Sequence, residues 1–266
     1  MTRLLDGKRI LVTGLVTTDS IAFAVAESVL AHGGEIALTV LGRDRERAES
    51  AAAHLSVAVT VLEVDLTQPE HLESLAGDLA DRWGNLDGAL HAVAFAPAEA
   101  LGGDFLGAGM DAIGRAFHAS TQSYAALAQV LADLAPPAGG SIVGLDFAAD
   151  GAWPVYNWMG VCKAALEAAS RYIARDLGPR CIRSNLVAAG PIQTRAAGGI
   201  PDFEVLTSAW AAQSPIAWDP TDSQPVADAV TFLFSDLARM VTGEILHVDG
   251  GYHAMAAPLR RVPAPV

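Results

Sequence analysis

The chain has 266 residues, a hydrophobic content of 52% and a formal net charge of −13. This length suffices for one large α/β domain, which buries most of its unfolded surface without disulfide or metal staples. The acidic charge argues against nucleic acid as a partner, and with neither a signal peptide nor an apolar run of about 18 residues we expect a cytoplasmic protein that does not enter the membrane.

Seven short runs rich in β-branched and other apolar residues recur along the chain. Most are apolar nearly throughout, which is typical of parallel strands buried on both faces. In chain order, the predicted strands are Arg9–Thr13, Glu35–Val40, Val57–Leu62, Gly88–Val93, Ser141–Leu145, Ile182–Val187 and Glu244–Val248.

Between these runs lie longer segments with helical spacing of their apolar residues. The predicted helices are Ser20–His32, Arg43–His54, Pro69–Trp83, Met110–Leu134, Pro154–Leu177 and Pro225–Leu237. The alternation of strands and helices predicts an α/β fold, a single-domain Rossmann-type doubly wound parallel sheet of about seven strands in residues 1–256. Residues 257–266, which contain three prolines and two arginines, are expected to form a C-terminal tail. Cys162 and Cys181 lie inside apolar patterns and are expected to be free thiols.

The first motif is the turn after the first strand, Thr13–Ala22. Gly14 lets the backbone approach a pyrophosphate, and the N-terminus of the next helix offers free amides and the positive end of its dipole. The turn is not a full G-x-G-x-x-G motif, because no further glycine occurs before Gly33. Ser20 takes the place of a glycine, either as a phosphate donor or as a helix cap in an ordinary strand–helix turn.

The second motif is a tyrosine and a lysine, Tyr156 and Lys163. Seven positions are close to two helical turns, so both side chains are expected on one face of a helix. A tyrosine can donate a proton to a substrate oxygen, and a nearby ammonium lowers the tyrosine pKa and can hold a ribose hydroxyl. The chain has 15 arginines but only two lysines, which suggests for Lys163 a task that arginine cannot perform. The pair is equally consistent with a surface lysine and a half-buried tyrosine on an amphipathic helix.

The third motif is Asn185–Thr194, in which a predicted strand ends in a Gly190-Pro191 turn. Ligands of doubly wound sheets bind at the carboxyl ends of the strands. Ile192 and Thr194 are therefore placed to pack and hydrogen-bond against a nicotinamide, although an ordinary strand-exit turn has the same appearance.

The order Gly14-x5-Ser20-Ile21-Ala22, Tyr156-x6-Lys163 and Ala189-Gly190-Pro191-Ile192-x-Thr194 resembles the enoyl-acyl carrier protein reductases of the short-chain dehydrogenase/reductase superfamily. The discriminating feature is the spacing of six residues, because most short-chain reductases have three between the tyrosine and the lysine. The resemblance runs from Leu4 to about Tyr252. It is strongest to mycobacterial members of the family, in Leu4–Val12, Tyr156–Met159 and Arg183–Ile192.

This resemblance implies reduction of trans-2-enoyl thioesters with NADH, in fatty acid or related lipid or polyketide biosynthesis. Tyr156 would hydrogen-bond the thioester carbonyl and stabilise the enolate, Phe147 would lie next to the site of hydride transfer, and Met159 would line the acyl pocket. Lys163 would bind the nicotinamide ribose. The other implied cofactor-binding residues are Gly14, Ser20 and Ile21 at the pyrophosphate, Leu41 after the second strand, Asp65 and Leu66 at the adenine, Val93 and Ala94 beside the cofactor backbone, and Ile192 and Thr194 at the nicotinamide amide. No metal is implied.

Two departures from the family pattern concern the cofactor. The segment His91–Phe95 reads His-Ala-Val-Ala-Phe where family members commonly read His-Ser-Ile-Gly-Phe, so a hydroxyl is lost and Ala94 puts a methyl where glycine permits close approach. The segment Leu41-Gly42-Arg43 lacks the acid that favours an unphosphorylated ribose. The resemblance alone implies that NADH is preferred, and Gly42 in place of an acid beside Arg43 predicts that NADPH is tolerated.

A third departure concerns the substrate. The segment Pro201–Ala212 is expected to cover the acyl chain, yet it carries Asp202 and Glu204 and no base. Because an acidic carrier protein usually needs basic contacts, either the carrier docks elsewhere or the substrate is a coenzyme A ester. Only 23 residues run from Thr194 to Ile216, fewer than in mycobacterial members, which predicts short to medium acyl chains unless the loop is mobile and insensitive to length.

Two other interpretations stay open, namely a carbonyl or hydroxysteroid-type reductase on the same fold and an NAD(P)-binding regulatory paralogue with weakened catalysis. The six-residue spacing and Phe147, near the position expected for a catalytic serine, disfavour the first. Retention of Tyr156 and Lys163 disfavours the second. The resemblance also implies a homotetramer, for which Met110–Leu134 and Pro154–Leu177 could supply the interface if they do not merely cover the sheet.

Overall fold

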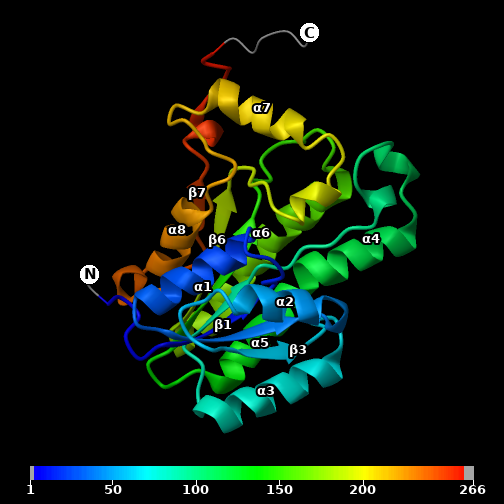
Figure 1. The fold of residues 1–266 in the computed structure, drawn as a ribbon. Coiled ribbons are helices and arrows are strands. Elements are labelled where there is room, and N and C mark those ends of the chain that lie inside the picture. The colour runs from blue at the N-terminus through cyan, green and yellow to red at the C-terminus, as the bar shows by residue number, and fades with distance from the viewer. Residues whose placement is uncertain (1–2, 261–266) are drawn as a thin grey trace.

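The computed structural model describes residues 3–260. Its centre is a sheet of seven parallel strands in the order β3-β2-β1-β4-β5-β6-β7 (Figure 1). The strands are β1 (Arg9–Thr13), β2 (Glu35–Val40), β3 (Thr60–Glu63), β4 (Gly88–His91), β5 (Gly140–Asp146), β6 (Ile182–Ala189) and β7 (Ile245–Val248). The strand order reverses between β1 and β4, which opens a crevice at the carboxyl ends of these two strands. The predicted fold class is confirmed.

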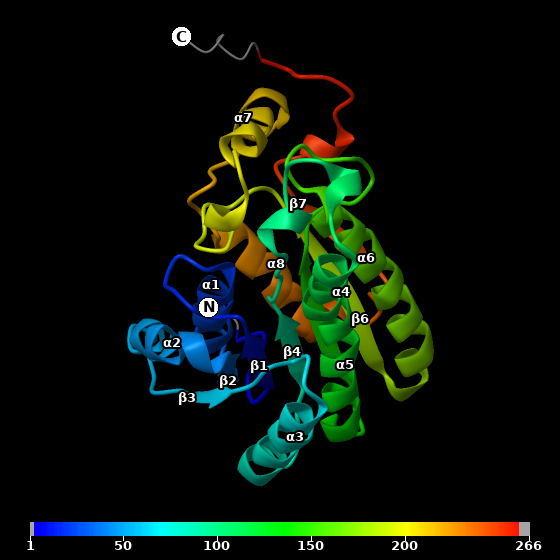
Figure 2. The ribbon, with the colours of Figure 1, turned by 90° about the vertical axis from the view of Figure 1, so that its right-hand side faces the viewer.

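Helices cover both faces of the sheet (Figures 1 and 2). One hydrophobic cluster joins the sheet to α1 (Ile21–Ala31), α2 (Arg45–Ala52) and α8 (Gln224–Phe234). A second cluster joins its other face to α3 (Pro69–Trp83), α5 (Ser123–Leu134) and α6 (Asn157–Leu177). In Figure 2, α4 (Met110–Phe117) continues the line of α5 toward the carboxyl edge of the sheet. The helix α7 (Glu204–Gln213) lies beyond the carboxyl ends of β6 and β7 (Figure 1).

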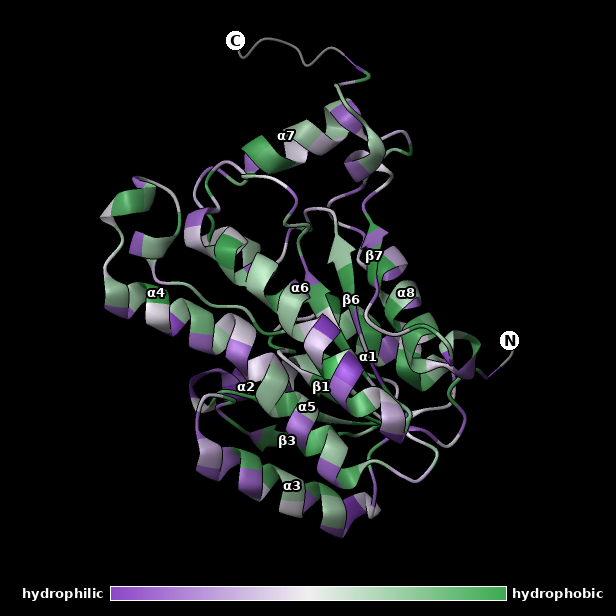
Figure 3. Ribbon diagram, turned by 180° about the vertical axis from the view of Figure 1, so that it is seen from behind, coloured by the Kyte–Doolittle hydropathy of each residue, from purple (hydrophilic) through white to green (hydrophobic). Residues whose placement is uncertain are grey.

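Successive side chains along a strand point to opposite faces of the sheet and so contribute to both halves of the core. In β1, Ile10 and Val12 belong to the first cluster while Leu11, between them, belongs to the second. A strand that buries both faces reads as a continuous apolar run, which is why its bounds were predictable. The helices bury one stripe each. In α3 the buried stripe includes Leu75 and Leu79, while hydrophilic residues, purple in Figure 3, occur at intervals along the rest of the helix.

The segment predicted as one helix, Met110–Leu134, is helical throughout but changes its winding. A π-helical turn, His118–Gln122, separates α4 from α5. Polar side chains of this turn bond outward: Ser120 Oγ accepts from the Phe95 amide at 2.9 Å, and Thr121 Oγ1 donates to the Cys162 carbonyl at 2.8 Å. The prediction of a uniform helix was wrong here, because apolar spacing does not register one extra residue in a turn. Sequence reasoning also gave no helix for α7.

Short 3₁₀ turns connect many of these elements: η1 (Gly42–Asp44), η2 (Ala98–Ala100), η3 (Phe105–Gly107), η5 (Gly178–Arg180), η6 (Ala197–Gly199), η7 (Asp236–Ala238) and η8 (Tyr252–Ala254). Cys162 and Cys181 are free, as predicted. Within the predicted tail, the amides of Leu259 and Arg260 both donate to the Ala212 carbonyl at 2.9 Å, and residues 261–266 lie outside the described part. None of the helices within residues 3–260 has both the length and the apolar character of a membrane span.

Candidate active site

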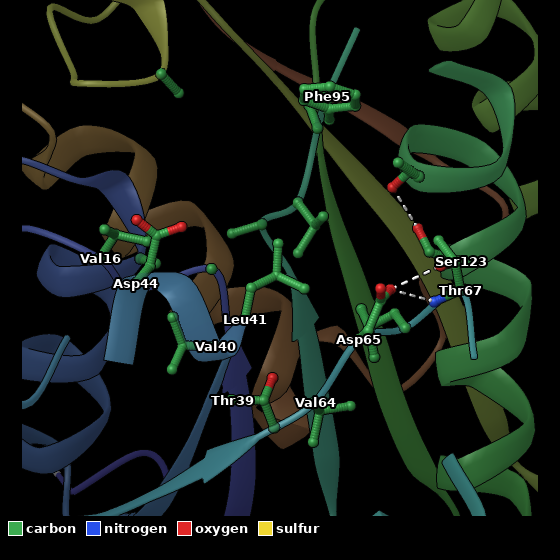
Figure 4. A pocket seen from close by; sticks show the side chains of 18 of the residues that line it. Val16, Thr39, Val40, Leu41, Asp44, Val64, Asp65, Thr67, Phe95 and Ser123 are labelled. Atoms are coloured by element: carbon green, nitrogen blue, oxygen red, sulfur yellow. Dashed lines mark hydrogen bonds between the residues drawn. The ribbon is translucent and has the colours of Figure 1, made fainter. Parts of the chain in front are cut away.

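A cavity of about 1270 Å³ opens at the carboxyl edge of the sheet (Figure 4). It exceeds the usual size of a small-molecule pocket, and it lies at the reversal of strand order where doubly wound folds bind nucleotides. Most of the predicted cofactor residues line it, namely Gly14, Ser20, Ile21, Leu41, Asp65, Leu66, Val93, Ala94, Lys163 and Thr194. Ile192 does not line the cavity, and its side chain is buried.

In the turn between β1 and α1, contacts within the protein also explain Gly14 and Ser20, which the sequence analysis related to a bound pyrophosphate. Gly14 has a left-handed backbone (φ 76°), and a Cβ there would collide with the Ala92 carbonyl oxygen at the exit of β4. A glycine is thus required by a neighbouring strand as well as by any ligand. Ser20 acts as the N-cap of α1: its Oγ accepts from the Phe23 amide at 3.2 Å and donates to the Thr17 carbonyl at 2.7 Å. The first amides of α1 therefore face the cavity from a capped, fixed helix end.

On the opposite side of the cavity from Asp65 lies Asp44, with Leu41 between them (Figure 4). Asp65 is fixed by its own turn, in which its Oδ1 accepts from the amide and the hydroxyl of Thr67 at 2.9 and 2.7 Å. Sequence reasoning did not single out Asp44. The available signal was an acid placed shortly after the second strand, where ribose-binding acids occur in doubly wound folds.

Asp44 corrects the premise that no acid stands beside Arg43. Its carboxylate lies 3.6 Å from Arg43, 3.2 Å from Arg47 and 3.9 Å from Arg195. In addition, the Glu63 carboxylate occupies the position that a side chain at Gly42 would take. The acid missing at position 42 is thus replaced by two acids from nearby positions, and the arginines are partly neutralised.

Lys163 reaches the cavity from α6. Its ammonium donates to the Leu145 carbonyl at the end of β5, at 2.7 Å, and the residue is only 5% exposed. Burial lowers the Lys163 pKa, and the neighbouring Asp146 carboxylate opposes that change. An ammonium held by a single carbonyl keeps two further donors for a ligand in the cavity.

Tyr156 precedes α6 by one residue instead of lying within it. Both neighbours, Val155 (φ 59°) and Asn157 (φ 39°), have left-handed backbones, which is costly for a β-branched residue. The Asn157 side chain holds this turn by donating to the Gly102 carbonyl. Strained backbone of this kind gathers at functional sites, where the surrounding structure fixes it.

The expected effect of Lys163 on Tyr156 is contradicted. The tyrosine is 7% exposed, and burial, with the charges of Asp146 and Cys162, raises its pKa far above the usual value. It is therefore a neutral hydroxyl at physiological pH. Its Oη has no hydrogen-bond partner within residues 3–260 and is free to donate to a ligand.

Tyr156 lies outside the lining of the cavity, in a cluster of aromatic rings. Its ring centroid is 5.1 Å from that of Phe147, which in turn is 5.0 Å from Trp153 and 5.5 Å from Trp210. Met159 packs with Tyr156 in a small hydrophobic cluster and is buried. The structure thus packs Tyr156, Phe147 and Met159 together outside the cavity lining, whereas Lys163 lies on the cavity wall.

Two buried polar groups near Lys163 were not predicted as site residues. His91 is fully buried at the end of β4, where its Nε2 meets Ser123 Oγ at 2.7 Å, and burial lowers its pKa to about 3. Asp146 is 5% exposed and neither carboxylate oxygen has a partner within the described residues. Burial raises the pKa of Asp146 to about 7, against the pull of Lys163.

We expect Asp146→Asn to change how stability depends on pH. An acid whose folded pKa is raised keeps its proton between about pH 4 and pH 7 while the unfolded chain releases it, so its contribution to stability is lost as pH rises through that window. The loss amounts to at most about 4 kcal/mol. Unfolding by urea should therefore show the free energy of the variant rising relative to that of the wild type between about pH 4 and pH 7 and then levelling off.

The comparison must be between variants, because His91 opposes Asp146. Its lowered pKa makes stability rise with pH between about 3 and 6.5, which flattens the wild-type curve. Asp78→Asn, at an exposed aspartate of α3, is the matched control and should follow the wild type at every pH. A difference between Asp146→Asn and wild type that is independent of pH would contradict the raised pKa.

Comparison with known proteins agrees with this geometry. A family model described as enoyl-(acyl carrier protein) reductase matches residues 14–253. Proteins named enoyl-[acyl-carrier-protein] reductase [NADH] from Mycolicibacterium smegmatis and Mycobacterium avium are 39% and 40% identical, each covering 94% of this chain and 98% of the relative. One from Neisseria meningitidis is 40% identical, covering 93% of this chain and 95% of its own length. The resemblance drawn from the motifs is confirmed, and the chain belongs to the enoyl-(acyl carrier protein) reductase family.

Proposed function

We propose that this protein reduces trans-2-enoyl thioesters to saturated acyl thioesters with NADH, in fatty acid or related lipid or polyketide biosynthesis. The observation that carries the proposal is that α6 brings a buried lysine to the cavity wall and that the residue just before α6 is a buried tyrosine with a free hydroxyl, in a chain of this family. The names of the relatives specify both the acyl carrier protein and NADH.

The described residues fit a dinucleotide. The cavity is large enough, and the capped N-terminus of α1 lines it with Ser20, Ile21 and Ala22, where free amides suit a pyrophosphate. Leu41 and Asp65 are on walls suited to the adenosine, and Asp44 is suited to a ribose hydroxyl. At the other end, Lys163 and Thr194 are suited to the second ribose and the nicotinamide amide. Ile192, which is buried and outside the cavity lining, would act through packing alone.

When bound, the cofactor supplies a hydride to the β-carbon of the enoyl thioester. Negative charge then develops on the thioester carbonyl oxygen, to which the neutral Tyr156 hydroxyl donates a hydrogen bond. Lys163 fixes the ribose and adds a positive charge near that oxygen. Phe147 and Met159 hold Tyr156 in place and exclude water. A proton added at the α-carbon of the resulting enolate completes the saturated product.

The test is to follow NADH consumption with crotonyl-coenzyme A and with crotonyl-acyl carrier protein. Turnover of either supports the proposal, and the ratio of the two decides which carrier the enzyme uses. Binding of NADH without reduction of any enoyl thioester would favour a regulatory NAD(P)-binding protein instead. Reduction of ketones but not of enoyl thioesters would favour a carbonyl reductase.

We expect kcat/KM to be higher with NADH than with NADPH, and we expect Asp44→Asn to reduce this difference. Asp44 sits among Arg43, Arg47 and Arg195, so its charge opposes a ribose phosphate that the arginines would otherwise attract. Its removal should raise the NADPH-to-NADH ratio of kcat/KM roughly tenfold, or about 1.4 kcal/mol. Asp219→Asn, an exposed aspartate in another loop, is the control. An unchanged ratio in Asp44→Asn would mean that Asp44 does not face the ribose.

The proposal extends to the assembly and the place of action. Residues 1–256 are proposed to act as one reductase domain in the cytoplasm, and as a homotetramer built on α4, α5 and α6. Exposed apolar side chains on these elements, among them Met110, Phe117 and Val161, support a subunit interface there. Sedimentation at several concentrations tests the tetramer.

A further inference from the structure

Tyr156 and four other aromatic rings form a cluster that comes from four separate parts of the chain. Phe147 follows β5, Trp153 and Tyr156 precede α6, Trp210 belongs to α7, and Tyr252 belongs to η8. Beyond the contacts of Phe147, Trp153 lies 5.1 Å from Trp210 and 5.6 Å from Tyr252, and Trp210 stacks on Tyr252 with centroids 3.8 Å apart and planes 8° apart. The rings form one continuous packed body, which we call the aromatic plug.

The plug is firmly seated. Trp210 is 2% exposed, and Leu206, one helical turn earlier in α7, is 1% exposed, so both lie on the inner face of the helix. The indole packs so closely on Gly190 that a Cβ there would lie 2.7 Å from its Nε1. Gln213, at the end of α7, donates to the carbonyls of Tyr252 and Met255 at 3.3 and 2.9 Å. Helix α7 and the segment that carries Tyr252 are thereby joined, so moving one ring requires moving two segments.

The position of the plug bears on the substrate. None of its rings lines the cavity, whereas Lys163 and Leu145 do, so the plug lies outside the cavity, next to the part of its wall that the end of β5 forms. The thioester carbonyl must meet the Tyr156 hydroxyl, and the β-carbon must face the cavity. The acyl carbons beyond the β-carbon have to leave the cavity along Tyr156 and Phe147, where Trp153 and Trp210 fill the space.

We infer that Trp153 and Trp210 determine acyl-chain length, restricting this enzyme to short trans-2-enoyl thioesters. This inference rests on the proposed function and names the substrate class within it. The loop length predicted short to medium acyl chains, and the inference attributes a narrower, short-chain preference to two specific side chains instead. In a pocket that accepted a long chain, each buried methylene would raise the affinity for the substrate roughly fourfold. Because the aromatic plug fills this space, a longer chain does not bind more tightly to this enzyme.

The experiment measures kcat/KM for the trans-2 crotonyl, octenoyl and dodecenoyl esters of coenzyme A, with NADH. The wild type should fall at least tenfold from crotonyl to dodecenoyl. Trp210→Ala and Trp153→Ala should each raise the dodecenoyl-to-crotonyl ratio at least tenfold, and Trp210→Phe, which keeps a smaller ring, should lie between. Trp83→Ala makes the same change at the end of α3, far from the plug, and should keep the wild-type ratio.

A second measurement, of binding instead of turnover, distinguishes a variant with an opened pocket from a variant that does not fold. Lauroyl-coenzyme A, a saturated ester that cannot react, should bind Trp153→Ala more tightly than wild type by calorimetry, with NADH present. If wild type does not reduce crotonyl-coenzyme A, the proposed function fails. If wild type reduces crotonyl and dodecenoyl esters equally well, or if both alanine variants keep the wild-type ratio and the wild-type affinity for lauroyl-coenzyme A, the inference fails and the function stands.

Discussion

Replacing Tyr156 with phenylalanine is expected to lower kcat for enoyl thioester reduction by 10²–10³, or about 2.7–4 kcal/mol, the usual effect of removing one preorganised donor from an oxyanion site. The buried phenol is neutral and its hydroxyl has no hydrogen-bond partner within residues 3–260, so its hydrogen bond is reserved for the substrate. The ring itself, packed against Phe147, is preserved by the substitution. KM and NADH affinity should therefore change little.

Stopped-flow and steady-state assays with crotonyl-coenzyme A measure kcat, KM and NADH affinity separately. Tyr172→Phe removes a hydroxyl from the exposed face of α6, the helix that follows Tyr156, and its kcat should equal that of the wild type. If Tyr156→Phe retains the wild-type kcat, the carbonyl oxygen is stabilised by another group, and the proposed role of Tyr156 is wrong.

The sequence predicted this arrangement only in part, and the strands show why. β1 and β2 are buried on both faces, so apolar runs mark their ends, and both begin and end as predicted. β3 begins at Thr60, three residues later than predicted, because its pairing with β2 starts at Thr60 opposite Ala37. Pairing is set by the neighbouring strand, and a single apolar run does not contain that information.

The spacing of Tyr156 and Lys163 indicated the right pair of residues but not their geometry. Helical periodicity assumed that α6 includes Tyr156, whereas left-handed backbones at Val155 and Asn157 set the tyrosine just before the helix. This turn depends on Gly102, which is distant in the sequence and accepts the bond from Asn157. No local pattern predicts such a contact.

The two acids near the ligand sites were missed for related reasons. Asp44 looked like one more charge on an amphipathic helix, and its significance comes from three arginines, one of them Arg195 from the turn after β6. Asp146 lies one residue beyond the predicted strand Ser141–Leu145, and its burial is the main cause that raises its pKa to about 7. Pairing with distant residues determines the role of Asp44, and burial determines that of Asp146. Neither feature can be read from the composition.

The same packing connects the two halves of the site. Leu145 and Asp146 end β5, Phe147 follows them, and Lys163 reaches back to the Leu145 carbonyl. One strand end therefore positions the ammonium on the cofactor side and the first ring of the aromatic plug on the substrate side. Substitution of Lys163 should therefore weaken cofactor binding in the first place, because the packing of the aromatic plug does not depend on the charge of Lys163.

Lys163→Ala is expected to weaken NADH binding by roughly 10- to 100-fold, because hydrogen bonds to a charged group contribute about 1.5–3 kcal/mol. Fluorescence titration of NADH measures this without turnover. Lys163→Arg should not restore binding, since a planar guanidinium does not fit a site that is 5% exposed and shaped for one ammonium beside Leu145.

The other lysine provides the control for this prediction. Lys8 pairs with Asp236 at 2.9 Å on the protein surface, remote from the cavity, so Lys8→Ala removes the same charge from the chain without touching the site. It should leave NADH affinity unchanged. Equal losses in both variants would mean that net charge, and not the position of Lys163, governs binding. A loss confined to Lys163→Ala, with the Tyr156→Phe variant still binding NADH normally, would separate the residue that holds the cofactor from the one that polarises the substrate.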